Sequence, residues 1–72
     1  MSNNELHFTV FCIENIALYL NKNGAEIYKL LKEDSEILDN YIIPHYDTLH
    51  TQGKDYIVAD IVEFMREKRL IL

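Results

Sequence analysis

The stretch LHFTVFCIENIALYL, residues 6–20, decides the fold of this sequence. Five of its apolar residues follow one another at intervals of four, three, four and three, which is the spacing of one stripe along an α-helix. They are Leu6, Val10, Ile13, Ala17 and Leu20. Phe8 and Phe11 widen the stripe, so only a narrow wedge of the helix is polar. We therefore expect a long first helix, capped by Asn3 or Asn4 and covered on more than one side.

Two shorter helices are predicted to follow. Asn23 and Glu26 are three residues apart, the spacing of a capping box, and they predict a second helix over residues 24–33. Asp34 or Ser35 can cap a short third helix. Its apolar positions, at Ile37, Leu38 and Tyr41, are expected to face inward.

Proline and glycine set the expected boundaries of the last two helices. The residue before Pro44 disfavours the helical conformation, so the third helix must end near residue 43. Pro44 then suits the first turn of a short fourth helix, which Gly53 would end in the left-handed conformation. Asp55 is expected to cap a last helix over residues 56–68. The prediction is an all-α fold, a small bundle of four to five helices in which two longer terminal helices bracket shorter ones.

The same periodicity predicts which side chains form the core. Eight apolar residues are expected to be largely buried: Val10, Ile13, Ala17, Leu30, Leu38, Ile57, Ile61 and Phe64. The apolar tail at residues 70–72 is expected to dock on the bundle.

Length and composition narrow the class of protein. With 72 residues and 49% apolar content, the chain makes one domain over residues 1–72. Its single cysteine, Cys12, excludes an internal disulfide and fits a reducing, cytoplasmic location. No apolar run approaches the roughly 20 residues that span a bilayer, so no membrane association is expected. The net charge of -5 argues against a nucleic-acid partner, because such proteins neutralise phosphates.

One segment, HYDTLHTQGK at residues 45–54, concentrates the polar chemistry. We select five of its residues as a candidate recognition surface: Tyr46, Asp47, His50, Thr51 and Gln52. Asp47 and His50 are three residues apart, so on a helix they share a face and can form a hydrogen bond or an acid–base pair. The alternative interpretation is architectural, with Thr51 and Gln52 satisfying carbonyls at a helix end. The architectural interpretation is slightly favoured, because polar side chains commonly bond the backbone carbonyls that are left exposed where a helix ends.

Other chemistry is not indicated by the sequence. There is no glycine-rich phosphate loop, cysteine pair or His-Glu-x-x-His pattern, so no catalytic residue, metal site or cofactor is predicted. Cys12 lies among apolar residues and is expected to be an inert buried thiol. His7 is expected to be solvated, and the Phe and Tyr residues at helical spacing are expected to form the core rather than a stacking platform.

The stretch YIIPHYDTLHTQG, residues 41–53, together with the following YIV at residues 56–58, resembles a family of small bacterial proteins known only as a domain of unknown function. Its pattern reads I-I-P-x-Y-D-x-L-H-T-Q-G, and the resemblance extends from the first helix to Met65. It implies a short, intracellular, stand-alone protein. It also implies an accessory or neutralising partner of an ADP-ribosyltransferase-like protein, because genes of both kinds lie near each other.

Three functions are consistent with these observations. The favoured one is a small cytoplasmic protein-interaction module without enzymatic activity, whose partner is another protein or a second copy of the chain. A homodimer seam could form from the tail and from the apolar rows of the last helix, Ile57–Ile61–Phe64 and Val58–Val62–Met65. The alternatives are a helix-turn-helix-like nucleic-acid binder and a small-ligand or enzymatic site at Tyr46, Asp47 and His50.

Overall fold

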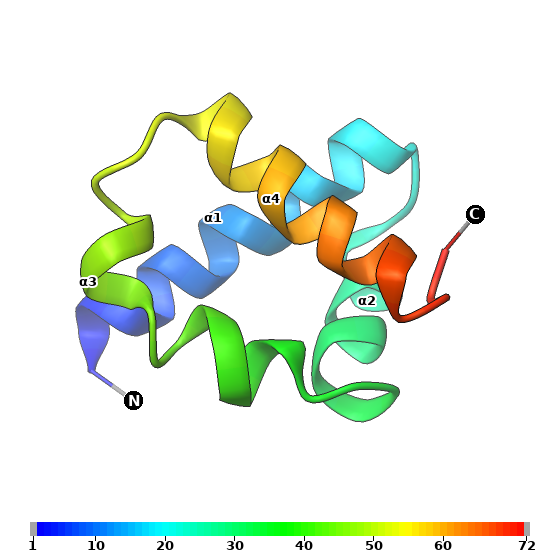
Figure 1. Ribbon diagram of the computed structural model, residues 1–72, viewed down its shortest axis with the longest axis horizontal. Coiled ribbons are helices and arrows are strands. Elements are labelled where there is room, and N and C mark those ends of the chain that lie inside the picture. Colours follow the sequence, from blue (N-terminus) through cyan, green and yellow to red (C-terminus); the bar gives the residue numbers. More distant parts are fainter. Residues whose placement is uncertain (1, 72) are drawn as a thin grey trace.

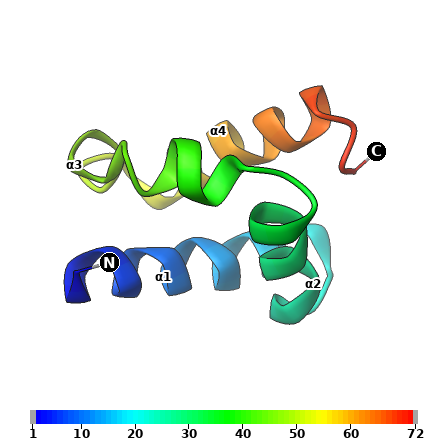
Figure 2. The same ribbon diagram turned by 90° about the horizontal axis from the view of Figure 1, so that it is seen from below.

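The computed structural model describes residues 2–71, and every regular element in that range is helical. In chain order they are α1 (Asn3–Leu20), α2 (Gly24–Tyr28), the π-helical turns η1 (Lys29–Glu33) and η2 (Leu38–Ile42), α3 (Tyr46–Leu49) and α4 (Lys54–Glu67). The all-α prediction is confirmed, with long α1 and α4 bracketing the shorter elements. Figure 2 shows α1 as one layer, with α3, η2 and α4 as a second layer over it and α2 at one end.

The N-terminal cap of α1 differs from the one predicted from the sequence. Its cap is Ser2, whose Oγ accepts from the Glu5 amide at 3.1 Å while the Glu5 carboxylate accepts from the Ser2 amide at 2.9 Å. The expected caps, Asn3 and Asn4, lie inside the helix instead. At the other end Asn21 adopts the left-handed conformation, with φ of 55°. The predicted capping box of α2 is confirmed, because the Asn23 side chain accepts from the Glu26 amide at 2.8 Å.

Ser35 holds the bend between the two π-helical turns. Its hydroxyl donates to the Leu30 carbonyl at 2.7 Å and accepts from the Ile37 amide at 3.3 Å. As predicted, this helix ends near residue 43, since η2 ends at Ile42 and Ile43 is its C-cap. Ile43 keeps helical angles, with φ of -67° and ψ of -49°, so the expected avoidance of the helical conformation before Pro44 does not occur.

Pro44 and Gly53 have other roles than the sequence suggested. Pro44 lies in the turn before α3, which begins at Tyr46, so it does not occupy the first helical turn. Gly53 has φ of -71° and ψ of 157°, an extended conformation, and it is the N-cap of α4, which begins at Lys54. The predicted left-handed stop at Gly53 is therefore wrong. Asp55 lies within the first turn of α4 and does not cap it.

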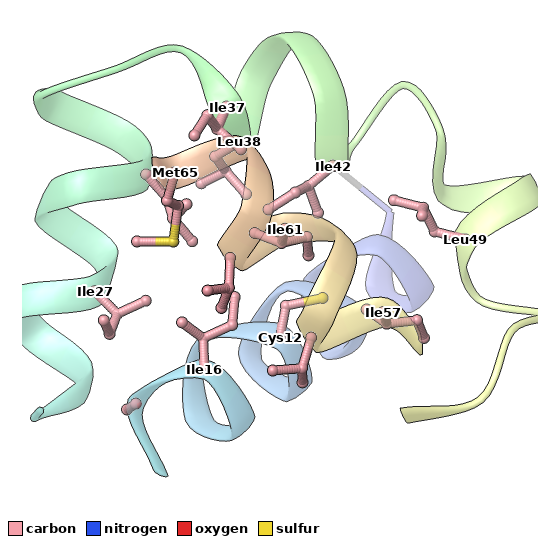
Figure 3. Packing of buried hydrophobic residues seen from close by; sticks show 14 of the residues in the cluster. Cys12, Ile16, Ile27, Ile37, Leu38, Ile42, Leu49, Ile57, Ile61 and Met65 are labelled. Carbon is pink, nitrogen blue, oxygen red and sulfur yellow. The ribbon is translucent and has the colours of Figure 1, made fainter. Parts of the chain in front are cut away.

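The core fills the space between the two layers (Figure 3). Its buried apolar residues are Phe8, Cys12, Ile16, Ala17, Ile27, Leu31, Ile37, Leu38, Ile42, Leu49, Ile57, Val58, Ile61, Val62 and Met65. Among the eight predicted core residues, Ala17, Leu38, Ile57 and Ile61 are confirmed, and Ile13, Leu30 and Phe64 are half-buried against the core. Val10 is 43% exposed, so its predicted burial is wrong.

The apolar rows of α4 are used inside the molecule. Their residues are buried or packed against the core, and α4 lies across α1 in Figure 1. The rows are therefore largely covered within the chain and do not present the exposed homodimer seam that the sequence suggested, although Val58 also borders a surface hollow. Leu70 and Ile71 also pack against the core, which confirms the predicted docking of the tail for these two residues. Leu72 lies outside the described residues.

Candidate functional site

The polar segment singled out from the sequence forms α3 and the turn that follows it. Leu49 is buried and anchors this short helix to the core. His50 ends the helix, with its amide donating to the Tyr46 carbonyl at 2.9 Å. The remaining side chains of the segment are exposed or half-buried, so α3 presents them on the molecular surface.

His50 is held by its own helix. Its Nδ1 lies 2.7 Å from the Tyr46 carbonyl oxygen, and its ring stacks on the Tyr46 ring at 4.3 Å with an interplanar angle of 10°. A carbonyl oxygen only accepts, so Nδ1 must carry the proton. In the neutral imidazole, Nε2 then keeps a lone pair that can accept a hydrogen bond from a ligand.

Tyr46 joins α3 to α1. Its ring is half-buried and meets the ring of Phe8 edge to face, with the centroids 5.4 Å apart. Phe8 in turn lies 6.2 Å from Phe11, one helical turn further along α1. These three rings form an aromatic wall between the two layers, which is the packing expected of a tyrosine whose ring faces inward.

A shallow groove of about 340 Å³ opens beside this wall. Its lining comprises Asn4, His7, Phe8, Phe11, Tyr46, His50, Gln52 and Ile57. The groove therefore brings together three of the five predicted site residues, Tyr46, His50 and Gln52. Its apolar floor and its rim of imidazole and amide groups suit the binding of a ligand with both apolar and polar parts.

Sequence reasoning missed the contribution of α1 to this groove. His7 was expected to be solvated, and Phe11 was expected to lie in the core, yet both line the groove and Phe11 is 36% exposed. The available signal was their spacing. Asn4, His7, Phe8 and Phe11 follow one another at intervals of three, one and three, so they share one face of α1.

Asp47 and Thr51 lie outside the groove. The Asp47 side chain is exposed and makes no hydrogen bond or ion pair with any residue in 2–71, so the expected pair with His50 does not form. The Thr51 hydroxyl donates to the Thr48 carbonyl at 2.8 Å. That bond is the architectural role that the sequence offered as the alternative for Thr51.

The polar groups that line the groove do not form an acid–base pair with one another in the described part of the chain. His50 has no carboxylate partner to orient it as a general base, since its Nδ1 is bonded to a backbone carbonyl. Cys12 is buried in the core, and burial raises the pKa of its thiol to about 12. Within the described residues, no three His, Cys, Asp or Glu side chains are grouped so that they could hold a metal ion. No helix in 2–71 combines the length and apolar character needed to cross a membrane.

A second polar pair lies apart from the groove. The Tyr41 hydroxyl donates to the Asp60 carboxylate at 2.5 Å, which links η2 to α4. The Tyr41 ring also contacts the rings of His45 and Phe64, at 4.9 and 5.0 Å. This pair could not be predicted from local spacing, because its members are 19 residues apart in the sequence.

Comparison with known proteins identifies a family for the chain. The model of a family described as a protein of unknown function (DUF3791) matches residues 7–68. The match covers α1 from residue 7 onward, α3, α4 and every residue of the groove lining except Asn4. No curated protein and no solved structure matches the chain.

Proposed function

The chain belongs to the DUF3791 family, whose function is unknown, and we propose that it is a protein-binding module that holds a segment of another protein in the groove between α1 and α3. The proposal assigns the recognition role to Tyr46, His50 and Gln52, together with His7 and Phe11 from α1. It assigns no catalytic role to the chain.

The observation that carries this proposal is the exposed apolar surface of α1. Among residues 2–71, seven large apolar side chains are exposed, and five of them lie on α1: Leu6, Val10, Phe11, Leu18 and Tyr19. Of these five, Phe11 lines the groove, where it lies beside the polar groups of His7, His50 and Gln52. An exposed apolar side chain with polar groups at its edge is typical of a protein-interaction site. Aromatic side chains beside polar groups also supply much of the binding energy at protein interfaces.

Geometry favours binding over the enzymatic alternative at Tyr46, Asp47 and His50. Only Tyr46 and His50 line the groove, and the Asp47 carboxylate lies elsewhere. An acid–base mechanism at these residues would need a carboxylate within hydrogen-bond reach of the imidazole. A recognition surface needs only the aromatic wall and the free donors and acceptors, and both are present.

A narrower proposal names the partner. The resemblance implies that an ADP-ribosyltransferase-like protein is the partner and that the chain is its accessory or neutralising protein in the cytoplasm. A small rigid domain that seats a segment of such a protein would neutralise it by covering its surface. Co-expression of the two proteins followed by size-exclusion chromatography tests this narrower proposal, and separate elution would contradict it.

The general proposal is tested with three variants of the same short segment. His50→Ala and Gln52→Ala remove side chains that line the groove, and Asp47→Ala is the matched control outside it. Each tagged variant is expressed in the native host, crosslinked and analysed for co-purifying proteins. We expect the two groove variants to lose a protein that the wild type and Asp47→Ala retain. All three are expected to unfold within about 0.5 kcal/mol of the wild type, because they change exposed side chains.

Two outcomes would contradict the proposal. If the groove variants retain every protein that the wild type captures, the groove is not the binding surface. If His50→Ala or Gln52→Ala keeps its partner but unfolds at clearly lower denaturant concentration, the segment is architectural, as the alternative interpretation of the sequence holds.

A further inference from the structure

We infer that the chain associates with a second copy of itself through a hollow between the C-terminal half of α1 and the start of α4. The hollow has a volume of about 360 Å³. Its lining comprises Asn15, Leu18, Tyr19, Lys54, Asp55, Val58 and Ala59. None of these residues lines the groove at α3, so this surface is separate from the proposed recognition site.

The first argument is the placement of apolar side chains. Leu18 and Tyr19 are 80% and 61% exposed, the two most exposed large apolar residues between positions 2 and 71. They border a hollow whose lining also includes the buried Val58 and the small residue Ala59. A projecting leucine beside an apolar hollow is a self-complementary surface. In a dimer with two-fold symmetry, the leucine of each copy enters the hollow of the other.

The second argument is charge. Lys54 and Asp55 both line the hollow, and neither forms an ion pair with another residue in the described part of the chain. Consecutive residues of a helix point in different directions, so these two side chains do not face each other. The inferred dimer has its two-fold axis between these two positions, so that Lys54 of one copy lies opposite Asp55 of the other and the pair occurs twice.

Lys54 and Asp55 also explain why the two copies associate through the hollow between α1 and α4. The whole chain carries a net charge of -5, so two copies repel each other over most of their surface. The lining of the hollow contains one cation and one anion, so this repulsion is absent there. A second copy therefore meets less electrostatic repulsion at the hollow than over the rest of the surface.

The mass of the intact protein in solution tests the inference. Sedimentation equilibrium over a dilution series is expected to show a species of twice the 8.5 kDa chain mass that dissociates on dilution. Leu18→Glu is expected to weaken the dimer at least about tenfold, because it places a charge at the centre of the interface. Leu6→Glu is the matched control, since Leu6 is an exposed leucine of α1 that lies outside the hollow.

Charge reversal gives an independent check. Lys54→Glu and Asp55→Lys each create like charges across the two-fold axis, so each is expected to weaken the dimer. The double variant restores opposite charges and is expected to recover it. Circular dichroism shows whether each variant is folded, and all of these substitutions are at exposed positions.

Several results would overturn the inference. These are a wild-type chain that stays monomeric at every concentration, or a Leu18→Glu variant that dimerises as the wild type does. Equal weakening by Leu6→Glu would place the interface elsewhere. A double charge reversal that associates no better than the single ones would exclude the two-fold pairing.

Discussion

At the scale of single residues, the contacts of Tyr41 favour the protonated form of its hydroxyl. Its ring lies against Phe64 and His45, and its hydroxyl donates to the Asp60 carboxylate. Keeping the hydrogen bond requires the phenol proton, so this bond is the main reason that the pKa of Tyr41 rises to about 12. Burial and the negative charge of Asp60 act in the same direction.

This raised pKa predicts a loss of stability in alkaline solution. The ordinary pKa of tyrosine is 10.0, so the unfolded chain loses the Tyr41 proton at lower pH than the folded chain. The contribution of Tyr41 is therefore fully present below pH 10 and falls as the pH rises toward about 12. Chemical denaturation at a series of pH values measures this slope. Tyr41→Phe keeps the ring contacts and removes the phenol, so we expect a shallower alkaline decline.

The comparison between the two proteins isolates Tyr41, because every other residue is the same in both. Parallel alkaline declines for wild type and Tyr41→Phe would contradict the prediction. It would then follow that the bond to Asp60 does not stabilise the protonated phenol in solution.

Single residues also show how much of the candidate site could be predicted. Tyr46, His50 and Gln52 were identified because polar and aromatic groups are concentrated in one segment. Asp47 was paired with His50 on helical spacing, yet α3 has only four residues, and His50 bonds to its own helix. The α1 residues of the groove were missed because their contact with α3 is tertiary. Local spacing cannot report a neighbour that is distant in sequence.

At the scale of elements, α1 shows the limit of apolar periodicity. The predicted stripe ran through Val10 and Ile13, but the buried side runs through Phe8, Cys12 and Ile16. A helix that is apolar on most of its surface fits several stripes, and only tertiary contacts select one. Thr9 is buried on the selected side because its hydroxyl donates to the Glu5 carbonyl at 2.8 Å.

Because α1 buries a different side from the one predicted, we expect different costs for shortening two apolar side chains that the sequence assigned to the core. Ile61→Ala removes a fully buried side chain of α4 and is expected to cost about 2–5 kcal/mol through lost burial and a cavity. Val10→Ala removes a side chain that is 43% exposed and is expected to cost less than about 1 kcal/mol. Urea denaturation of both variants measures the free energy of unfolding. Equal costs would mean that α1 presents Val10 to the core after all.

Helix ends were predicted only in part. Ser2 caps α1 in place of the expected Asn3 or Asn4, and Asp55 does not cap α4. Asn23 caps α2 as expected, because its carboxamide and Glu26 form a local motif. Arg69, which follows α4 after its last residue Glu67 and its C-cap Lys68, adopts the left-handed conformation with φ of 61°, although it is not a glycine. Gly53 was expected to end the helix at α3 in the left-handed conformation. It directly precedes α4 instead and adopts an extended conformation. The π-helical turns likewise depend on contacts of Ser35 across a bend.

At the scale of the whole molecule, α1 organises two surfaces. Its N-terminal half borders the groove at α3, and its C-terminal half borders the hollow at α4. Its buried side meets the second layer along its length (Figure 2). One helix therefore supplies the base of the core, the proposed recognition surface and the proposed dimer contact. This arrangement lets a chain of 72 residues present two binding surfaces on one small core.

Charge over the whole molecule gives the last prediction, which concerns the nucleic-acid alternative. We expect no appreciable binding to duplex DNA at near-physiological salt, because net charge of -5 repels phosphates. Lys22, Lys29 and Lys32 are also paired with carboxylates, so they offer little free positive charge. Fluorescence anisotropy with a labelled duplex measures binding. A protein of known duplex affinity, measured under the same conditions, checks that the assay detects weak, salt-sensitive binding. Sub-micromolar, salt-sensitive binding by the wild type would instead favour the helix-turn-helix-like function, since such binding depends on displaced counterions.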